Sequence, residues 1–274
     1  MNDHRHTRLH PDRQPAATGA ALLCLVLAVG PMPGAAAEAP RPVGLSAWGT
    51  HQQRDYRVTG LRAFAGGFPV PGLDADAIAG IDNTVTQVAA KLDAWLLPWL
   101  NLHALLGHLS GKADATLAPA FAPMLGGVHS LRVEYDGILY GVGATLAAGA
   151  GPVFGSVTAA YTRADVDIDP PAGLAADNPR GIETIVIQPK IGLRFEPFSA
   201  WIGGYYQFTE HTQRATFRFP PPMGEVRAEV DVRDADRWGG LAGAQLDFGD
   251  RWNAVVEVSF GNGTQVTAGV GFRF

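Results

Sequence analysis

The sequence is poor in cysteine and in charge. It has one cysteine, Cys24, in 274 residues, and only 17% of its residues are Asp, Glu, Lys or Arg. A single cysteine excludes a framework of internal disulfides and a metal site built from several thiolates. The formal net charge is −5, and a net-acidic chain argues against nucleic-acid binding.

A long apolar run is also missing. The apolar segment Ala20–Val29 is too short to span a bilayer as a helix. Arg5, Arg8 and Arg13 precede it, and a run of small residues ending at Ala37 follows it. This order predicts a secretory signal at residues 1–37, cleaved after Ala37, which would leave a mature chain without cysteine.

Glycine is abundant, with 34 residues. Two windows, Ala94–Gly111 and Gly137–Thr162, contain no Asp, Glu, Lys or Arg. The second has six glycines and Pro152, which argues against one helix and indicates a hairpin. The first divides similarly at Pro98.

Apolar residues alternate with small or polar ones through most of the chain, as in strands with one face in an apolar environment. The pattern predicts nine strands, each of the length that crosses a bilayer. They are Thr84–Leu97, Trp99–Leu109, Ile138–Ala147, Val153–Thr162, Glu183–Phe195, Ser199–Thr209, Trp238–Phe248, Trp252–Phe260 and Thr264–Phe274.

The joints between these segments alternate in length. Short joints fall at Pro98, Gly149–Pro152, Glu196–Phe198 and Gly249–Arg251, and long polar ones at Gly111–Asp136, Arg163–Arg180 and Glu210–Arg237. Strands in lipid must pair all their backbone groups, so the sheet has to close. The sequence therefore predicts an all-β fold, a transmembrane antiparallel up-and-down β-barrel with short periplasmic turns and long outer loops.

The predicted strand count is ten. A chain that starts in the periplasm needs one more upward strand before Thr84, and Asp55–Gly66 is the best candidate. Residues 38–54 would then be a periplasmic segment, and residues 55–274 the barrel. Eight or twelve strands remain alternatives. One reason is that Leu131, Val133 and Tyr135 alternate in the phase opposite to Ile138, which a bulge at Gly137 would reconcile.

Aromatic residues gather beside the short joints, where an interfacial girdle is expected. The predicted girdle consists of Trp95, Trp99, Phe195, Phe198, Trp201, Phe248 and Trp252.

With its export signal, alternating strands and terminal Phe274, the chain resembles the small outer-membrane β-barrel proteins of Gram-negative bacteria. Val270, Phe272 and Phe274 look like the signal that the barrel assembly machinery recognises. The resemblance implies a monomer in the outer membrane, with that machinery, membrane lipid and lipopolysaccharide as partners and no nucleic acid. The resemblance implies almost nothing about an activity.

The alternation predicts a polar, mostly filled lumen. Charges of both signs point inward and are expected to pair, because buried charges need partners. Asp93 and Asp247 should form a layer with Arg194 and Arg273 near the periplasmic mouth. The whole predicted lumen cluster is Lys91, Asp93, Lys190, Arg194, Asp247, Glu257 and Arg273, with Asn101 and His103 also inward.

No cofactor or metal site is predicted. His103 and His108 fall on opposite faces of one strand, and the run Asp165, Asp167, Asp169 lacks the glycine and closing Glu of a calcium loop.

We predict a structural, interaction or limited-permeation role rather than an enzymatic one. A lipid A or phospholipid hydrolase is one alternative, for which Ser156, His211 and Glu210 are loose candidates. An adhesin or receptor that uses the outer loops is another.

Overall fold

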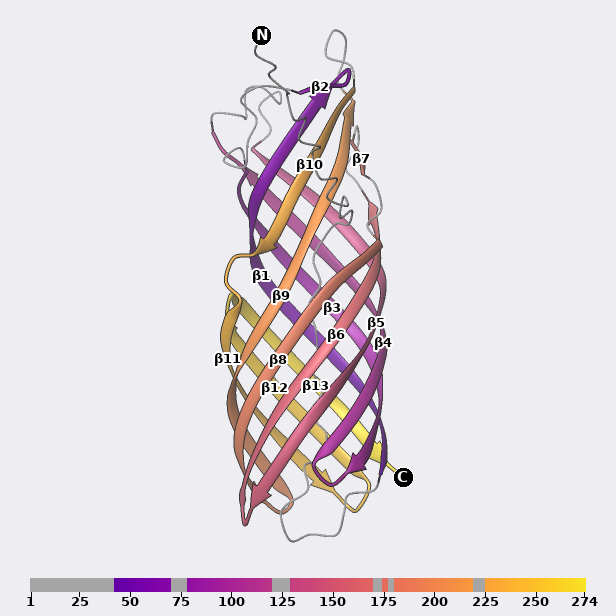
Figure 1. Ribbon diagram of the computed structural model, residues 1–274, viewed down its shortest axis with the longest axis vertical. Helices are drawn as coiled ribbons and strands as arrows, with labels where there is room; N and C mark the ends of the chain where they lie inside the picture. The colour runs from indigo at the N-terminus through magenta and orange to yellow at the C-terminus, as the bar shows by residue number, and fades with distance from the viewer. Residues whose placement is uncertain (1–41, 70–77, 120–128, 170–173, 177–179, 219–224) are drawn as a thin grey trace, which may run out of the picture.

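The alternating segments form thirteen strands of one antiparallel sheet (Figure 1). The computed structural model describes residues 42–69, 78–119, 129–169, 174–176, 180–218 and 225–274, so the predicted signal at residues 1–37 lies outside it. The strands are β1 (Val43–Ala65), β2 (Phe68–Pro69), β3 (Ile78–Leu97), β4 (Leu100–Leu117), β5 (Ser130–Ala150), β6 (Val153–Asp169), β7 (Leu174–Ala176), β8 (Arg180–Phe195), β9 (Phe198–Arg218), β10 (Glu225–Asp234), β11 (Trp238–Phe248), β12 (Trp252–Gly261) and β13 (Gly263–Arg273). Among the described residues, no helix has the length and apolarity needed to cross a bilayer.

The sheet closes into the ten-strand antiparallel barrel that the sequence predicts. Its circuit runs through β1, β3, β4, β5, β6, β8, β9, β11, β12 and β13, and β13 returns to β1. On one side of β1, Gly44 pairs with Arg273; on the other, Val43 pairs with Ala94. We call this part of the molecule the ten-strand section.

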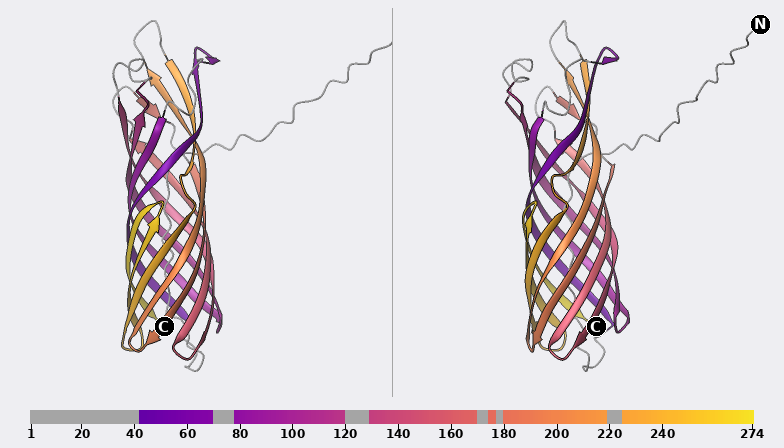
Figure 2. Two further views of the ribbon diagram at one scale, coloured as in Figure 1. Left: turned by 90° about the vertical axis from the view of Figure 1, so that its left-hand side faces the viewer. Right: turned by 60° about the vertical axis from the view of Figure 1, so that its left-hand side comes forward.

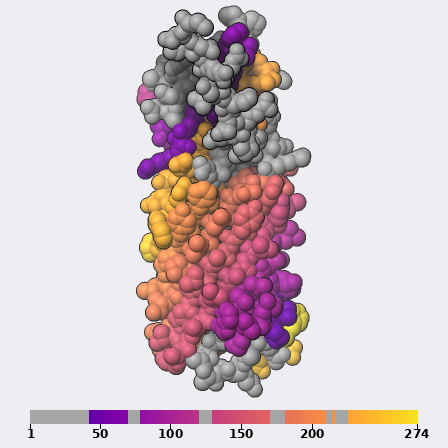
Figure 3. Space-filling view, viewed as in Figure 1, coloured from indigo at the N-terminus to yellow at the C-terminus, as the bar shows by residue number. Residues whose placement is uncertain are grey.

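The two faces of the wall differ as the alternation requires. Val88 on β3 and Ile202 on β9 point outward and are 64% and 65% exposed. Gln87 and Gln207, on the same two strands, point inward and are at most 2% exposed. Apolar side chains cover the outside of the ten-strand section on every strand of the circuit, as a lipid-facing wall requires. The continuous outer surface over β6, β8 and β9 is visible in Figure 3.

Tight turns join the strands at one end, which we call the short-turn end. They lie between Leu97 and Leu100, Ala150 and Val153, Phe195 and Phe198, and Phe248 and Trp252. Gly249 has a φ of +67° in the last of these, a conformation that costs glycine little and other residues more. All four turns fall at the predicted short joints.

The first strand starts earlier than expected. β1 begins at Val43 rather than at Asp55, so residues 43–54, expected in a periplasmic segment, belong to the barrel wall. Inward Ser46, Thr50 and Gln52 alternate with outward Leu45 in this stretch. The outward face also carries Gly49, His51 and Gln53, so its apolar alternation is too weak to reveal a strand in the sequence.

The predicted long outer loops are largely strand. β4 continues to Leu117, β6 to Asp169 and β9 to Arg218, all inside segments expected to be loops. On β4 and β6 the outer face is polar here, with Lys112, Asp165 and Asp167 exposed, so the alternation of a lipid-facing strand is lost although the backbone pairing continues. The tips of these loops fall in residues 120–128, 170–173, 177–179 and 219–224, outside the described residues.

There is no bulge at Gly137. The β4–β5 register runs without a shift from Leu100↔Leu146 to Thr116↔Ser130. Tyr135 and Leu139 both point inward and are at most 4% exposed, whereas Ile138 points outward. The apparent change of phase arises because the interior becomes apolar beyond this level, so apolar residues move from the outer face to the inner one.

Three strands, β11, β12 and β13, do not extend along the whole barrel and end part-way from the short-turn end. Beyond that level, β10 takes their place and pairs with both β9 and β1. Eight strands (β1, β3, β4, β5, β6, β8, β9 and β10) form the closed circuit in what we call the eight-strand section. Figure 2 shows the β12–β13 hairpin ending part-way along the wall, while β1, β9 and β10 continue past its tip.

Candidate functional site in the barrel lumen and wall

Lys190 and Glu257 form an ion pair inside the ten-strand section. The Lys190 Nζ lies 2.5 Å from Glu257 Oε2, and both side chains are at most 4% exposed. The indole Nε1 of Trp201 donates a second hydrogen bond, of 2.9 Å, to the same oxygen. Lys190 is on β8 and Glu257 on β12, so this contact crosses the two intervening strands β9 and β11 on the inner side of the wall.

Asp93 is the centre of a second group of hydrogen bonds and ion pairs in the lumen. Its Oδ2 accepts hydrogen bonds from Arg273 Nη2 at 2.6 Å and from Asn101 Nδ2 at 2.8 Å. Lys91 Nζ lies 3.7 Å from the other carboxylate oxygen and also lies over the Trp48 ring. All of these charged groups are at most 6% exposed. The carboxylate is thus shared between β3, β4 and β13.

Arg194 and Asp247 complete the predicted lumen cluster. Arg194 Nη2 lies 3.8 Å from Asp247 Oδ2, and the two side chains are 27% and 23% exposed. Gln245 Nε2 donates a hydrogen bond of 2.7 Å to the same carboxylate. The four charges expected to form one layer are therefore split between a buried pair, Arg273–Asp93, and this half-buried one.

Several inward polar atoms have no hydrogen-bond partner among the described residues. They include both ring nitrogens of His103 and the side-chain amides of Gln52 and Gln87. His103 is 6% exposed, while His108 points outward from the same strand. Such groups suit ordered water or a polar solute better than a dry core.

Two tryptophans of the predicted girdle are not in it. Trp95 and Trp201 are 9% and 4% exposed and face the lumen, where they pack in one cluster with Trp48 and Phe154. Strand parity explains this, because their neighbours Ala94 and Ile202 occupy the outer face. The other five residues are 44–58% exposed at the short-turn end: Trp99, Phe195, Phe198, Phe248 and Trp252.

The C-terminal aromatic residues lie at the same end. Val270 and Phe274 are about half exposed on the outer face. The Phe272 ring stacks edge-on between Trp252 and Phe274, at centroid distances of 4.8 and 5.0 Å. The backbone N–H of Phe274 donates to the Val43 carbonyl, which joins the chain end to the first strand.

The eight-strand section has an apolar interior. Tyr56, Leu109, Leu139, Ile182 and Val232 come from five different strands and are at most 3% exposed. They belong to one cluster with other inward residues of the section, namely Val85, Leu105, Tyr135, Ala160, Ala164, Val166 and Val186. The interior is thus apolar around this cluster, whereas the ten-strand section holds the ion pairs beside a second apolar cluster that includes Trp48 and Trp201.

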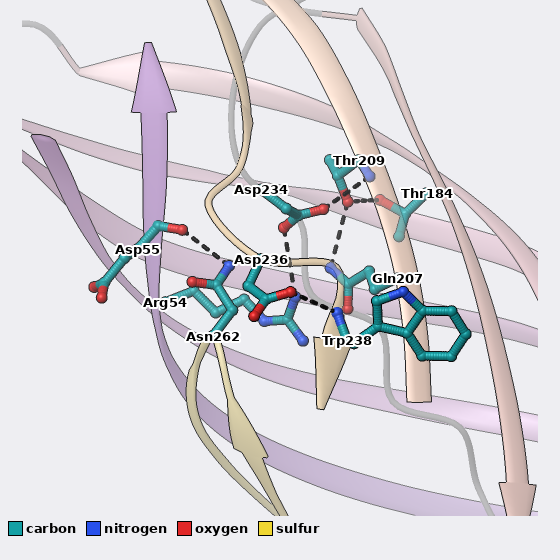
Figure 4. A network of polar contacts seen from close by, with 9 residues as sticks. All are labelled: Arg54, Asp55, Thr184, Gln207, Thr209, Asp234, Asp236, Trp238 and Asn262. Carbon is teal, nitrogen blue, oxygen red and sulfur yellow. Dashed lines mark hydrogen bonds and ion pairs between the residues drawn. The ribbon is translucent and has the colours of Figure 1, made fainter. Parts of the chain in front are cut away.

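A polar network lies where the two sections meet, at the joint between β10 and β11 (Figure 4). Arg54 Nη1 lies 3.4 Å from Asp234 Oδ1, and both side chains are at most 3% exposed. The other Asp234 oxygen accepts a hydrogen bond of 2.9 Å from the Thr209 backbone N–H. The Thr209 hydroxyl lies 3.0 Å from that of Thr184, and Gln207 also donates to it. The Asp234 carboxylate thus binds β9 at the point where the pairing of β9 passes from β11 to β10.

The sequence alone does not predict this network, because Arg54 fell in the expected periplasmic segment and Asp234 in an expected loop. The signal was present in β1, where Arg54 continues the inward series Ser46, Thr50 and Gln52.

The fold does not bring together the candidate hydrolase residues Ser156 and His211. Ser156 pairs with Lys190, and Lys190 with Gly203, whereas His211 lies further along β9. At about 3.3 Å per residue, the backbones of Ser156 and His211 are on the order of 25 Å apart. Asp165, Asp167 and Asp169 lie on the outer face of β6. Within the described residues, no group of three or more His, Cys, Asp or Glu is placed to hold a metal ion.

Comparison with known proteins identifies no family. No family model matches the chain, and no curated protein matches its sequence. Solved structures with a similar fold include the outer membrane protein OprG from Pseudomonas aeruginosa, at 12% identity and a TM-score of 0.47 over 86% of this chain and 99% of that one. Another is the transport unit of the autotransporter AIDA-I from Escherichia coli, at 10% identity and a TM-score of 0.44 over 86% and 91%.

The class follows from the molecule itself. A closed antiparallel sheet with an exposed apolar band and inward polar side chains is the architecture of an outer-membrane β-barrel protein.

Proposed function

We propose that this protein is a monomeric outer-membrane β-barrel that is closed to ions and allows at most limited permeation. The observation that carries the proposal is the buried Lys190–Glu257 ion pair, which joins β8 to β12 over two intervening strands inside the lumen. Arg273 reaches Asp93 across β1 in the same way. These bridges occupy the path that an ion would take along the axis.

Two physical arguments support a closed lumen. A barrel of this strand number is only slightly wider than one whose interior side chains fill. In addition, an ion leaving the polar section would meet the apolar cluster around Leu109 and Leu139, where its desolvation costs far more than an open pore permits.

Orientation and partners belong to the same proposal. Short turns face the periplasm in barrels of this class, which would place the eight-strand section outside the cell. The exposed apolar band would contact membrane lipid and the lipid portion of lipopolysaccharide, and the C-terminal strand would be read by the assembly machinery. The signal at residues 1–37 would direct export.

Single-channel recording in planar bilayers tests the closed lumen. We expect the wild-type protein to show no steady conductance, and the Lys190→Ala, Glu257→Ala double variant to show only brief openings, because the bridge is gone while the apolar cluster remains. The matched control is Arg194→Ala with Asp247→Ala, which removes a partly exposed ion pair near the short-turn end. A stable open conductance in the wild type would refute the proposal.

A further inference from the structure

We propose that the Asp55 and Asp82 carboxyl groups form a pH-sensitive latch between β1 and β3, in the eight-strand section of the wall. The latch holds the two strands together while the pair shares a proton. Charge repulsion parts the strands once both groups are ionised. The proposal goes beyond the closed lumen and does not depend on it.

The pairing of β1 with β3 stops before either strand ends. Their ladder runs from Val43↔Ala94 to Tyr56↔Ile81. Beyond Tyr56, β1 pairs with β10 on its other side, and only its last two residues pair with β2. The remainder of β3 pairs with β4 alone. Among the described residues, no backbone ladder therefore joins β1 to β3 past Tyr56.

Both strands are also irregular just past this point. The register of β1 against β10 shifts between Val58 and Gly60, and that of β3 against β4 shifts between Ile78 and Gly80. Irregularities of this kind bend a strand and increase its twist. In Figure 2, β1 continues upward beside β10 and away from the start of β3. The two strands thus diverge from the end of their common ladder.

Asp55 and Asp82 form the last outward-facing rung of that ladder, and both side chains are exposed. They lie directly opposite each other, close enough for a hydrogen bond between the two carboxyl groups. Two carboxyl groups can form that hydrogen bond only when one of them carries a proton. The observed geometry is therefore that of a protonated pair. Without the proton, like charges opposite each other destabilise the strand pair.

The charges around the pair do not neutralise it. Asp114 on β4 lies opposite Asp82 as a third carboxylate, and Arg132 binds Asp114 at 2.6 Å. Three further cations lie on the same outer face nearby: Arg57, Lys112 and Arg233. In the described part of the chain, none of them forms a salt bridge with either member of the pair.

Partial burial and the neighbouring carboxylates of Asp55 and Asp114 raise the pKa of Asp82 above its ordinary value. The shared proton is therefore held below this raised pKa and lost as the pH rises through it. The latch is closed in acid and open at neutral and alkaline pH.

Two sets of contacts define which part moves. On the other side of β1, the Asp55 carbonyl accepts hydrogen bonds from the Asn262 side chain at 3.0 Å and from the Ala235 N–H at 3.3 Å. Towards the short-turn end, the His51 ring and the Thr86 hydroxyl are hydrogen bonded at 3.0 Å, two outward rungs before the acid pair. The outer part of β1 would therefore leave β3 together with β10, and the separation would stop at the His51–Thr86 rung.

Amide hydrogen exchange of the protein in detergent micelles tests the latch at about pH 4 and about pH 8, on either side of the raised pKa. The test variant is Asp82→Asn, whose amide can still donate to Asp55 but carries no charge. The matched control is Asp136→Asn, because Asp136 lies opposite Asp167 in a like-charge rung with ladder on both sides. Exchange rates of residues 52–56 and 81–84 are compared with the wild type at the same pH, so that the intrinsic effect of pH cancels.

We expect these amides to exchange about two- to fivefold faster in the wild type than in Asp82→Asn at about pH 8, as the loss of one cross-strand repulsion implies. At about pH 4 the two proteins should exchange equally fast. Asp55→Asn should behave like Asp82→Asn, whereas Asp136→Asn should match the wild type in these segments.

Spin labels test the separation directly. Labels at Thr59→Cys on β1 and Thr116→Cys on β4 should lie further apart at about pH 8 than at about pH 4, and should keep one distance when Asp82→Asn is added. Equal exchange of wild type and Asp82→Asn at the higher pH would overturn the latch. A difference that persists unchanged at the lower pH, or a label distance that does not depend on pH, would overturn it as well.

Discussion

At the scale of single residues, the lumen charges differ in how completely they are buried. Glu257 is 4% exposed and accepts hydrogen bonds from both Lys190 and Trp201. Asp247 forms a longer ion pair with Arg194 and is 23% exposed. Water can replace a lost partner at Asp247 but has little access to Glu257, so equivalent substitutions at the two positions should have unequal effects.

We predict that Glu257→Ala lowers the free energy of unfolding by about 3–5 kcal/mol, because it leaves the Lys190 ammonium buried without a carboxylate. Asp247→Ala should cost less than about 1 kcal/mol, as for exposed pairs. Urea unfolding in detergent micelles, followed by tryptophan fluorescence, measures both. Adding Lys190→Met to Glu257→Ala should recover part of the loss. Equal effects of the two single substitutions would show that the lumen is hydrated throughout.

Gly263 is a second position where the burial of a single added atom, the Cβ of alanine, should have a large effect on stability. Its φ is +94°, and an added Cβ would lie 1.9 Å from the Gln53 carbonyl oxygen. Gly249 also has a positive φ, of +67°, but a Cβ there would meet nothing within 4 Å. Gly249→Ala should therefore cost about 1 kcal/mol of backbone strain alone.

Gly263→Ala should cost clearly more in the same unfolding measurement, because the hairpin tip must also move away from β1. A loss no larger than that of Gly249→Ala would mean that the tip is not held against β1.

At the scale of strands, alternation alone predicts the lipid-facing segments and their number. It works where one face meets lipid and the other a polar lumen, as in β8 and β12. It fails where that contrast disappears. The outward face of β1 between Gly49 and Asp55 is not apolar, and the interior beyond Gly137 is, so the start of β1 and the outer halves of the strands were not predicted. The Arg54–Asp234 network joins residues 180 positions apart, which no local pattern reveals.

Parity within a strand separates girdle tryptophans from lumen tryptophans. Trp99 is 52% exposed on the outer face, whereas Trp95, four positions away across the turn, is 9% exposed inside. In variants that retain one tryptophan, reconstituted in vesicles containing brominated lipid, we expect strong fluorescence quenching for Trp99 and Trp252 and weak quenching for Trp95 and Trp201. Strong quenching of Trp95 would place it in the girdle that the sequence first suggested.

The C-terminal strand supports a prediction about assembly. Phe274 is 57% exposed, and its N–H bonds to Val43, the first residue of β1. Deletion of Phe274 should reduce the amount of heat-modifiable protein in the outer membrane, because it removes both the terminal aromatic residue and a closing hydrogen bond. Phe248→Ala, at a 44% exposed aromatic position of the same end, is the control and should leave assembly near the wild-type level. Equal recovery of both variants would argue against recognition of the terminal residue.

At the scale of the whole molecule, the outer surfaces of the two sections differ in polarity. The ten-strand section is apolar outside and carries the lumen charges, whereas the eight-strand section has an apolar interior and surface ion pairs such as Arg132–Asp114 and Arg214–Glu229. A charged outer surface is stable in water, and an apolar outer wall is stable in lipid. The membrane should therefore surround only the ten-strand section.

This arrangement predicts which insertions are reached from outside the cell. An epitope tag between β9 and β10 extends the end that projects from the membrane, so antibody should bind it on intact cells. A tag at Gly249, in the turn between β11 and β12, should be bound only after the outer membrane is permeabilised, because the short-turn end faces the periplasm. Both tags should be detected equally in permeabilised cells, which controls for expression. Binding to the Gly249 tag alone on intact cells would invert the topology and place the eight-strand section on the periplasmic side.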